Sequence, residues 1–485
     1  MSAAIDTRLP LRRHAFGWPL WAALASGWML RDTLGLHPNA ALAWLAPLPL
    51  LVAAYRSAPR TAGWLAFLAG GIGAWVNFDY YALTSRGIWI PILIVLLQSL
   101  GWAAVVRRAS RAVQTLQHWS APLVYPMLCA GLDVMVTALS PHGSWGSLAV
   151  TQLAFPPVLQ IAALLGAPAI VFVISVPASV VAFALTRRRG DPRTWPSYAV
   201  PTLAVVAALG YGAARLANAA PAPNAALIGL TAIDVDPPLP RSAAERDALL
   251  ARYEANTSAL AVQGARLIVW PEKIARVDDA DAVAVQARLG ALAQRLDIEL
   301  VTSFAVGTPP ARHNVAWLFD PNGRLIADYA KQHPVPQLEA DIAAGDRDVV
   351  ANTVAGRTGL AVCADLMYPA LGRRYGRAGI DAVIAPAWDF DRDGALAGAI
   401  AALRGVESGY GVIRNAREGR LQIRDRYGRI VADSPSRTGT GSAALARLPT
   451  ASGATLYAWT GDIFGWLCAL GFWLLGIAGR PMLRR

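Results

Sequence analysis

Residues Arg266-Leu-Ile-Val-Trp-Pro-Glu272 join a short apolar run to a single carboxylate. The pattern returns twice, where Leu325-Ile-Ala-Asp-Tyr-Ala330 precedes Lys331 and Thr358-Gly-Leu-Ala-Val362 precedes Cys363. Such runs are typical of buried strands, and helical stretches lie between them, so the sequence favours an α/β sheet. Binding and catalytic groups gather at the strand ends of such sheets. We therefore expect a carboxylate, an ammonium and a thiol to converge at one sheet edge.

Lysine is almost absent from this chain. Of 44 basic residues, only Lys273 and Lys331 are lysines. A sequence that writes nearly every positive charge as arginine uses lysine where a compact ammonium with three donors is needed. We therefore interpret Lys331, together with Glu272 and Cys363, as one catalytic site, and we interpret Lys273 as a surface charge.

The composition indicates a membrane portion. Hydrophobic residues make up 55 % of the chain and the mean hydropathy is +0.38, whereas ordinary soluble chains contain about 45–50 % apolar residues. Apolar segments long enough to span a bilayer lie at 15–30, 40–55, 62–83, 87–106, 121–139, 159–186, 195–217 and 457–479. The sequence thus predicts a seven-span membrane domain over residues 1–217 and a further transmembrane helix over 457–479.

Arginine placement predicts the orientation, because cytoplasmic loops carry the excess of positive charge. The outside loops of the first seven spans hold only Arg31 and Arg86. We therefore expect a multi-pass protein with a cytoplasmic N-terminus and with residues 218–456 on the far side of the membrane. The inside segments hold Arg8, Arg12, Arg13, Arg56, Arg60, Arg107, Arg108, Arg111, Arg187, Arg188, Arg189, Arg193, Arg480, Arg484 and Arg485.

The net charge of +12 follows from this orientation and does not indicate a nucleic-acid ligand. Residues 220–450 carry 26 basic and 26 acidic side chains, so this outer domain is neutral. Cys129 and Cys468 fall inside expected spans, which leaves Cys363 as the single thiol of the outer domain. We find no disulfide framework and no His/Cys cluster with metal spacing, and we expect neither a metal nor an organic cofactor.

Strand and helix signals alternate over residues 220–450. Helices are expected at 241–263, 282–295, 369–378 and 394–408, and residues 332–347 are expected to form a loop over the site. Strands are expected near 225–233, 266–270, 298–305, 313–319, 324–330, 348–354, 358–362, 381–386, 410–415, 420–424, 429–432 and 442–447.

In this order, Glu272, Lys331 and Cys363 resemble the catalytic residues of the nitrilase superfamily. A nitrilase-like domain between seven spans and one more is similar in architecture to the apolipoprotein N-acyltransferase family over the whole chain. The resemblance implies a multi-span α-helical membrane domain plus an α/β nitrilase-like extramembrane domain, an αββα sandwich. The matching motifs are Trp270-Pro-Glu272, Tyr329-Ala-Lys331-Gln-His333-Pro-Val-Pro336 followed by Glu339, Gly359-Leu-Ala-Val-Cys363, Arg404-Gly-Val-Glu407-Ser-Gly409, Val412-Ile-Arg414-Asn415-Ala416 and Asn314.

The resemblance also implies a mechanism. Cys363 would be the nucleophile, Glu272 the general base, and Lys331 with the backbone amide of Ala364 the oxyanion stabilisers. An acyl chain would pass from a phospholipid to a thioester on Cys363, and then to the N-terminal diacylglyceryl cysteine of an apolipoprotein. Phospholipid, lipoprotein and membrane lipid are thus the implied partners of a protein that we expect to be a monomer. The implied location is the bacterial inner membrane, with the catalytic domain on the periplasmic side.

The family pattern suggests further site residues and shows departures. Glu339 would orient Lys331 or relay protons, Asp365 would support the site, and Trp388 and His333 are candidates for substrate contact. Glu339 and Asp365 can equally be surface carboxylates, His333 a structural residue and Trp388 a core residue. The departures are Ala364 and Asp365 where an aromatic residue and Glu are usual, Gln337-Leu338 in place of Phe-Gly, Lys273 in place of a small residue, and a missing Asn-Asp pair in residues 385–390.

Simpler interpretations remain open at this stage. Cys363 can be a packing residue, Glu272 a helix cap or a partner of Arg276, and Lys331 a solvated strand end. Two other function classes also fit the sequence. One is a membrane-tethered amidase or an acyltransferase with a different acceptor, and the other is a nitrilase-like domain that only binds a partner.

Overall fold

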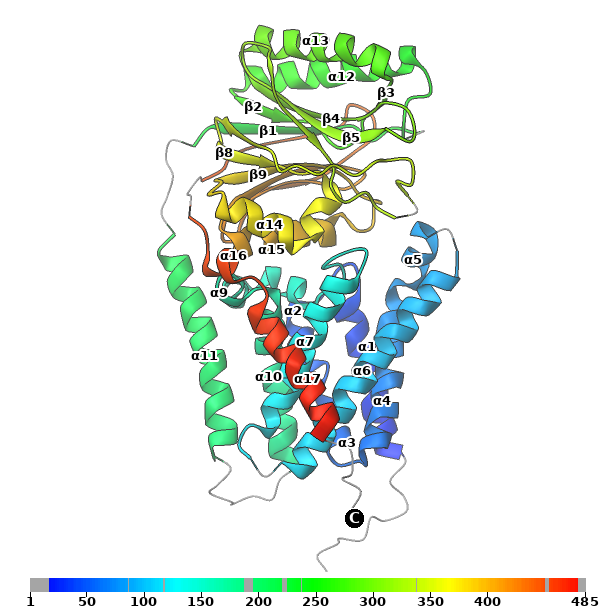
Figure 1. Cartoon of the computed structure of the whole chain (residues 1–485), viewed down its shortest axis with the longest axis vertical. Coiled ribbons are helices and arrows are strands. Elements are labelled where there is room, and N and C mark those ends of the chain that lie inside the picture. Colours follow the sequence, from blue (N-terminus) through cyan, green and yellow to red (C-terminus); the bar gives the residue numbers. More distant parts are fainter. Residues whose placement is uncertain are drawn as a thin grey trace, which may run out of the picture.

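The computed structural model describes residues 17–85, 87–116, 118–186, 195–219, 225–236, 238–336, 338–449 and 453–478. They form a bundle of helices and an α/β domain that sits on one end of the bundle (Figure 1). The chain builds most of the bundle first, then the α/β domain, and returns to the bundle with its last helix.

The helical part contains four helices, among the described residues, that are long and apolar enough to cross a membrane. They cover Trp89–Thr115, Ala121–Leu139, Ala167–Thr186 and Trp195–Ala217, and shorter apolar helices cover 40–55, 156–165 and 463–474. The predicted helical membrane domain is confirmed, while the number of spans stays a prediction. The elements are α1 (Gly17–Leu34), α2 (Ala40–Leu45), α3 (Leu48–Tyr55), α4 (Pro59–Ala74), η1 (Trp75–Asn77), α5 (Phe78–Thr84), α6 (Trp89–Thr115), η2 (Ala121–Leu123), α7 (Val124–Leu139), η3 (Leu148–Ala154), α8 (Pro156–Leu159), α9 (Ala162–Leu165), α10 (Ala167–Thr186), α11 (Trp195–Ala217), α16 (Leu456–Thr460) and α17 (Ile463–Ala478).

The arginines that predict the orientation gather at one end of the bundle where they are described. Arg56 follows α3, Arg60 lies in the first turn of α4, and Arg107, Arg108 and Arg111 lie in the last turns of α6, at the end away from the α/β domain (Figure 1). Arg31 lies in the last turn of α1, at the end of the bundle nearer the α/β domain. Arg8, Arg12, Arg13, Arg86, Arg187, Arg188, Arg189, Arg193, Arg480, Arg484 and Arg485 lie outside the described residues.

The segment 159–186, expected as one span, is interrupted at Gly166. This glycine has a φ of +78°, and a Cβ at its position would lie 2.4 Å from the ring of Tyr457. α10 begins at the next residue, where the amide of Ala167 donates to Glu407 Oε1 at 2.8 Å. A carboxylate stabilises the positive end of a helix, so Glu407 of the α/β domain helps to start a membrane helix. Local sequence does not reveal this cap, because the two residues are 240 positions apart.

The α/β domain consists of two sheets. The first has seven strands in the order β13-β1-β2-β4-β5-β6, with β3 beside β4, and the second has six in the order β12-β11-β10-β9-β8-β7. Parallel pairs form the centre of each sheet. In the first sheet β1 pairs with β2 and β2 with β4, and in the second β8 pairs with β9 and β9 with β10. The strands are β1 (Leu227–Ala232), β2 (Leu267–Val269), β3 (Arg276–Val277), β4 (Glu299–Val306), β5 (His313–Phe319), β6 (Leu325–Ala330), β7 (Val350–Thr353), β8 (Gly356–Leu360), β9 (Ala382–Trp388), β10 (Gly411–Arg417), β11 (Arg420–Arg424), β12 (Ile430–Pro435) and β13 (Ser442–Arg447).

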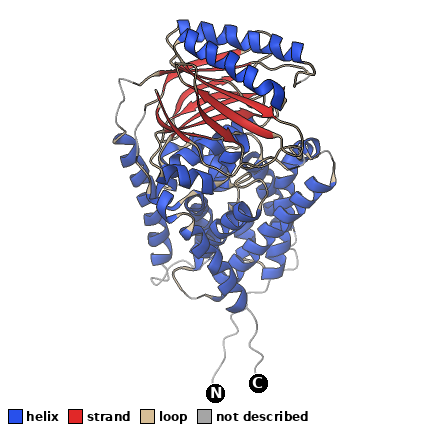
Figure 2. Ribbon diagram, turned by 45° about the horizontal axis from the view of Figure 1, so that its top comes forward, coloured by secondary structure: helices blue, strands red, loops and turns tan. Residues whose placement is uncertain are grey.

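Four layers result (Figures 1 and 2). The two sheets pack face to face, and fully buried side chains such as Leu230, Leu360 and Ile384 fill the space between them. Helices α12 (Ala243–Val262) and α13 (Asp279–Leu296) cover the first sheet, and α14 (Pro369–Arg377) and α15 (Gly394–Ser408) cover the second. The predicted αββα sandwich is therefore confirmed.

Helix α15 joins the two parts of the protein. Leu403 and Val406 pack with Ile170 of α10 in one apolar cluster, while Ala401 packs with Val383 of the second sheet in another. Because α15 has apolar partners on both faces, it is buried almost throughout. The outer layer of the α/β domain is thus also the surface that seats it on the bundle.

Candidate active site

The three residues singled out in the sequence come from two sheets that face each other. Glu272 follows β2 and Lys331 follows β6, both in the first sheet, whereas Cys363 follows β8 of the second sheet and begins the short 3₁₀ helix η5 (Cys363–Met367). The amide of Glu272 donates to the carbonyl of Ala387 in β9 at 3.1 Å, which joins the sheets beside the site. The expectation of a single sheet edge was wrong, because the strands that carry these residues belong to both layers of the sandwich.

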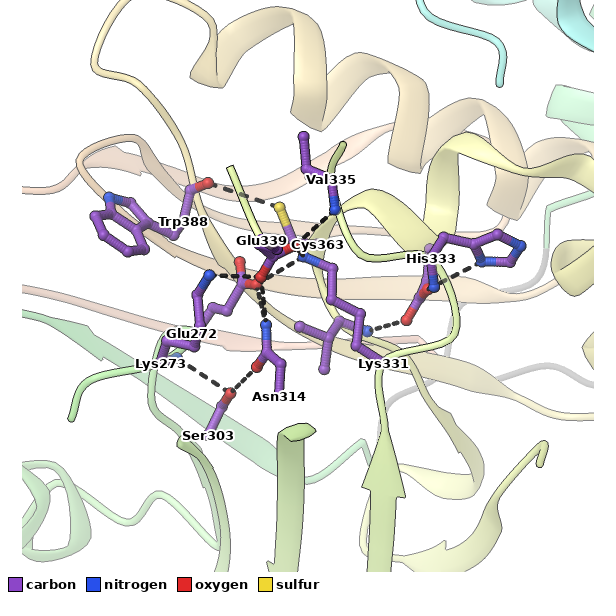
Figure 3. Close-up of polar contacts among 12 residues, drawn as sticks. Glu272, Lys273, Ser303, Asn314, Lys331, His333, Val335, Glu339, Cys363 and Trp388 are labelled. Atoms are coloured by element: carbon purple, nitrogen blue, oxygen red, sulfur yellow. Dashed lines mark hydrogen bonds and ion pairs between the residues drawn. The ribbon is translucent and has the colours of Figure 1, made fainter. Parts of the chain in front are cut away.

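Lys331 binds two carboxylates. Its Nζ donates to Glu272 Oε1 at 2.8 Å and to Glu339 Oε2 at 2.6 Å, and all three side chains are almost completely buried (Figure 3). Burial alone lowers the pKa of a lysine, but Glu272 and Glu339 outweigh it and raise the pKa of Lys331 well above its ordinary value. An ammonium has three donors, and these two bonds leave one of them for a further acceptor.

Glu339 accepts four hydrogen bonds. Its Oε2 accepts from Lys331 and from the amide of Val335 at 2.8 Å, and its Oε1 accepts from Lys273 Nζ at 2.5 Å and from Asn314 Nδ2 at 3.0 Å. Burial alone would raise its pKa, but Lys331 and Lys273 prevail and hold the pKa of Glu339 at about 2. A carboxylate so stabilised in its charged form is a poor proton acceptor.

Glu272 differs from Glu339 in having an oxygen to spare. Its Oε1 accepts from Lys331 and from Asn314 Nδ2 at 2.5 Å. Among the described residues no hydrogen-bond donor to its Oε2 is found, and the side chain lies in the same space as Cys363 (Figure 3). In the described part of the chain, Glu272 therefore keeps one carboxylate oxygen free beside Cys363, while both oxygens of Glu339 are engaged.

Cys363 is held in a strained backbone conformation. Its φ is +46°, in the left-handed region that L-residues adopt at a cost of about 1–2 kcal/mol. The Sγ is directed to the carbonyl oxygen of Trp388 at 3.6 Å, and Cys363 lies beside the buried carboxylates and Lys331 (Figure 3). Burial is the main cause that raises the pKa of Cys363, and Glu272 adds to it, while Lys331 lowers the pKa in part. Burial thus favours the neutral thiol of Cys363 over the thiolate.

Asp365 fixes the turn that carries the nucleophile. Its Oδ2 accepts from the amide of Val362 at 3.0 Å and from Tyr329 Oη at 2.7 Å. Its Oδ1 accepts from the amides of Gln332 at 3.1 Å and His333 at 2.8 Å. These bonds tie the residues around Cys363 to the segment that follows Lys331. The Asp365 carboxylate thus holds these two segments together.

The other predicted site residues fall into different places. Ala364 is in the first turn of η5, where backbone amides have no carbonyl one turn earlier to bond to. His333 points away from Lys331, stacks on Tyr368 with ring centroids 3.7 Å apart, and lies 3.0 Å from Asp365 through Nδ1 (Figure 3). Trp388 lies beside the site, with its Nε1 bonded to Glu418 at 2.9 Å and its ring under the Arg417 guanidinium at 3.7 Å.

Lys273 is a site residue that the sequence argument missed. Its Nζ reaches Glu339 and lies 5.3 Å from the ring centroid of Trp388, so it is not a surface charge. Both lysines of the chain therefore bind the same carboxylate. The signal was present, because the argument from rarity that selected Lys331 applies equally to Lys273. Ser303 was also missed, and its Oγ accepts from the Lys273 amide at 3.1 Å.

No group of three or more His, Cys, Asp or Glu side chains that could hold a metal ion occurs among the residues that the structure describes. Of the alternatives left open by the sequence, a pair between Glu272 and Arg276 is not found there either. A solvated Lys331 is excluded, since its side chain is 1 % exposed.

Comparison with known proteins agrees with this arrangement. The family model of the carbon-nitrogen hydrolases matches residues 224–447, and that of the apolipoprotein N-acyltransferase N-terminal domain matches residues 33–180. An apolipoprotein N-acyltransferase from Geobacter metallireducens is 28 % identical over 504 residues, which cover 93 % of this chain and 93 % of the relative. The chain is similar to the apolipoprotein N-acyltransferases over nearly its whole length. The resemblance found in the sequence is thereby confirmed.

Members of the wider nitrilase superfamily match shorter stretches than this N-acyltransferase relative does. A deaminated glutathione amidase from Synechocystis is 31 % identical over 149 residues, which cover 26 % of this chain and 55 % of the amidase. Among solved structures, an amidase from Nesterenkonia is 21 % identical, covers 46 % of this chain and 90 % of its own, and gives a TM-score of 0.40. The N-acyltransferase match extends over the helical and α/β parts alike.

Proposed function

We propose that this protein transfers an acyl chain from a phospholipid, through a thioester on Cys363, to the N-terminal diacylglyceryl cysteine of apolipoproteins. Similarity to an apolipoprotein N-acyltransferase over nearly the whole chain supports the overall reaction. The observation that carries the thioester route is the convergence of a neutral thiol, a carboxylate with an unbonded oxygen, and an ammonium with a donor to spare. These are the three parts that nucleophilic acyl transfer requires.

In the first half-reaction, Cys363 Sγ attacks the ester carbonyl carbon of the phospholipid and its proton passes to Glu272 Oε2. The remaining donor of Lys331 and the amide of Ala364 stabilise the oxyanion that forms. When the tetrahedral intermediate collapses, the carbon–oxygen bond breaks and the lysophospholipid leaves with the proton from Glu272. The acyl group remains as a thioester on Cys363.

In the second half-reaction, the acceptor's amino group attacks the thioester carbon and Glu272 takes its proton. The carbon–sulfur bond breaks, the sulfur recovers that proton, and the product is an amide. A thioester is also open to hydrolysis, so the site has to keep bulk water away. The docking of α15 on the bundle favours this, because it holds the domain against the membrane region that would deliver both lipids.

The arginine pattern supports a cytoplasmic N-terminus and a catalytic domain on the periplasmic side of the inner membrane. We propose this orientation together with a monomeric protein. A second candidate function is a membrane-tethered amidase or an acyltransferase with another acceptor. The departures at Ala364 and at residues 385–390 favour it, because they adjoin the nucleophile and Trp388. The third class, a domain that only binds a partner, is disfavoured by the polar contacts around Lys331.

One assay separates the three classes. The full-length protein in detergent micelles is given a phospholipid with a labelled acyl chain and a synthetic diacylated lipopeptide with a free amino terminus. We expect the label to appear on the lipopeptide as an amide. Release of labelled free acid with no transfer would instead assign the second class, and no turnover of any kind would assign the third.

Lys273 gives a separate prediction about Glu339. We expect Lys273→Ser to lower the free energy of unfolding by about 1.5–3 kcal/mol at neutral pH, because it removes a charge-assisted hydrogen bond. The low pKa of Glu339 stabilises the fold above its ordinary pKa of 4.5, and this contribution is lost as the pH falls toward about 2. The difference between the two proteins should therefore shrink steadily between these pH values.

Thermal unfolding in detergent, followed as a function of pH, provides the measurement. Lys273→Arg is the matched control, because it keeps the charge, and it should retain most of the stability. A difference between Lys273→Ser and the unmodified protein that stays constant down to pH 3 would show that Lys273 acts through packing and not through the charge of Glu339.

A further inference from the structure

A cavity of about 810 Å³ opens between α4 and α6 at the end of the bundle away from the α/β domain. Four arginines line it, Arg60 from α4 and Arg107, Arg108 and Arg111 from the last turns of α6. No acidic residue lines it. The cavity is also far from the catalytic cysteine, which lies in the α/β domain at the opposite end of the bundle.

The arginines are available for a ligand. None of the four forms an ion pair with a carboxylate among the described residues, whereas Arg246 and Arg312 of the α/β domain pair with carboxylates at 3.2 and 2.6 Å. Arg108 Nε is buried without a hydrogen-bond partner there. Its guanidinium lies 4.2 Å from the ring centroid of Phe472, which keeps it turned into the helices. Arg108 also donates to the carbonyl of Ala104 at 3.3 Å. Guanidinium groups that share one cavity and have no carboxylate partner favour a phosphate, which they can bind through paired donors.

The remaining walls are apolar. Trp64, Phe67 and Leu100 line the same cavity, and Trp64 and Leu100 have exposed side chains. A second cavity of about 430 Å³ adjoins it along α4 and α6, shares Phe67, and is lined by Ile72, Leu96 and other apolar residues. The site therefore has a cationic head and an apolar continuation toward the centre of the membrane.

Glycine shapes this groove. Gly63 of α4 faces α6, and a Cβ at its position would lie 3.4 Å from Arg107 Cβ. A larger side chain would fill the space in front of the arginines. Membrane orientation depends on the excess of positive charge at this end. It does not depend on the arginines lining a concave site with apolar walls.

We propose that this groove binds an anionic phospholipid of the leaflet away from the catalytic domain, with its phosphate among the arginines and an acyl chain along α4 and α6. An inorganic phosphate would use the arginines alone and would leave the apolar continuation empty. A zwitterionic lipid brings a cationic group that the four arginines would repel. The bound lipid is a structural ligand, distinct from the acyl donor of the proposed reaction.

The test uses the full-length protein, delipidated in detergent and examined by native mass spectrometry with added phosphatidylglycerol or phosphatidylcholine. We expect the protein to retain phosphatidylglycerol in preference. The double variant Arg107→Gln/Arg111→Gln should retain it roughly 30-fold less well, at about fivefold for each basic residue. The double variant Arg31→Gln/Arg56→Gln removes the same charge from outside the cavity and should retain the lipid normally.

Gly63→Leu tests shape, because it keeps all four arginines in the sequence and places a bulky side chain against Arg107. It should also lose phosphatidylglycerol. Equal retention of the two lipids by the unmodified protein would overturn the proposal. So would equal loss in both double variants, or normal retention by Gly63→Leu, since either result would mean that arginines attract anionic lipid without a built site. Acyl transfer is not measured, so failure of the proposed function would leave this test unaffected.

Discussion

Replacing Cys363 by Ala should abolish acyl transfer, with a fall in rate on the order of 10⁴-fold or more, because the proposed thioester forms on the sulfur of Cys363. The structure makes this expectation specific. Sγ of Cys363 is the sulfur that lies with Glu272 and Lys331, and the other described thiols, Cys129 and Cys468, lie in α7 and α17 of the bundle. Mass spectrometry of the intact protein after incubation with phospholipid alone should show one acyl thioester in the unmodified protein and none in the variant.

The matched control is the double variant Cys129→Ala/Cys468→Ala, which keeps Cys363 as its single thiol. It should form the same acyl adduct, seen as the same increase in protein mass. An acyl adduct that persists in Cys363→Ala would refute the thioester route. Transfer without any adduct in the unmodified protein would point to direct attack of the acceptor amine on the phospholipid.

Replacing Lys331 by Met should damage both folding and catalysis. The ammonium binds two buried carboxylates, and its removal leaves Glu272 and Glu339 as like charges that share one site. Breaking a buried pair on one side costs about 3–5 kcal/mol, and the loss of one oxyanion donor slows acyl transfer by about 10²–10³-fold. Thermal unfolding and the transfer assay measure the two effects independently.

Lys273→Met is the natural control, because it removes the other lysine bound to Glu339 and does not touch Glu272. It should lose less stability than Lys331→Met and should form the Cys363 thioester. Lys331→Arg should recover part of the stability and little of the transfer, because a planar guanidinium does not direct its donors as an ammonium does. Unchanged activity in Lys331→Met would remove the ammonium from the mechanism.

Much of the α/β domain could be predicted because its elements are local. α15 was predicted at 394–408 and occupies Gly394–Ser408, since the apolar period and the glycine that follows are both visible in the sequence. β3 was missed, because its two residues, Arg276–Val277, form a strand only by pairing with β4. The interruption at Gly166 was missed for the same reason, since its causes, Tyr457 and Glu407, lie far along the chain.

The site was predicted in its parts but not in its connections. Glu272, Lys331 and Cys363 each follow a recognisable strand, so their convergence could be inferred. The sequence does not contain the facts that sort the two carboxylates into base and support, namely the four donors around Glu339 and the unbonded oxygen of Glu272. These are three-dimensional contacts between residues up to 66 positions apart.

The position of α15 has a consequence for any attempt to study the soluble half by itself. Released from the bundle, this helix would present Leu403 and Val406 to water, and Glu407 would lose the amide of Ala167 that it now accepts. Such an excised fragment should aggregate even though its strands and catalytic groups are complete. The helix that would be the outer layer of a free-standing αββα domain is here an inner wall of the whole molecule.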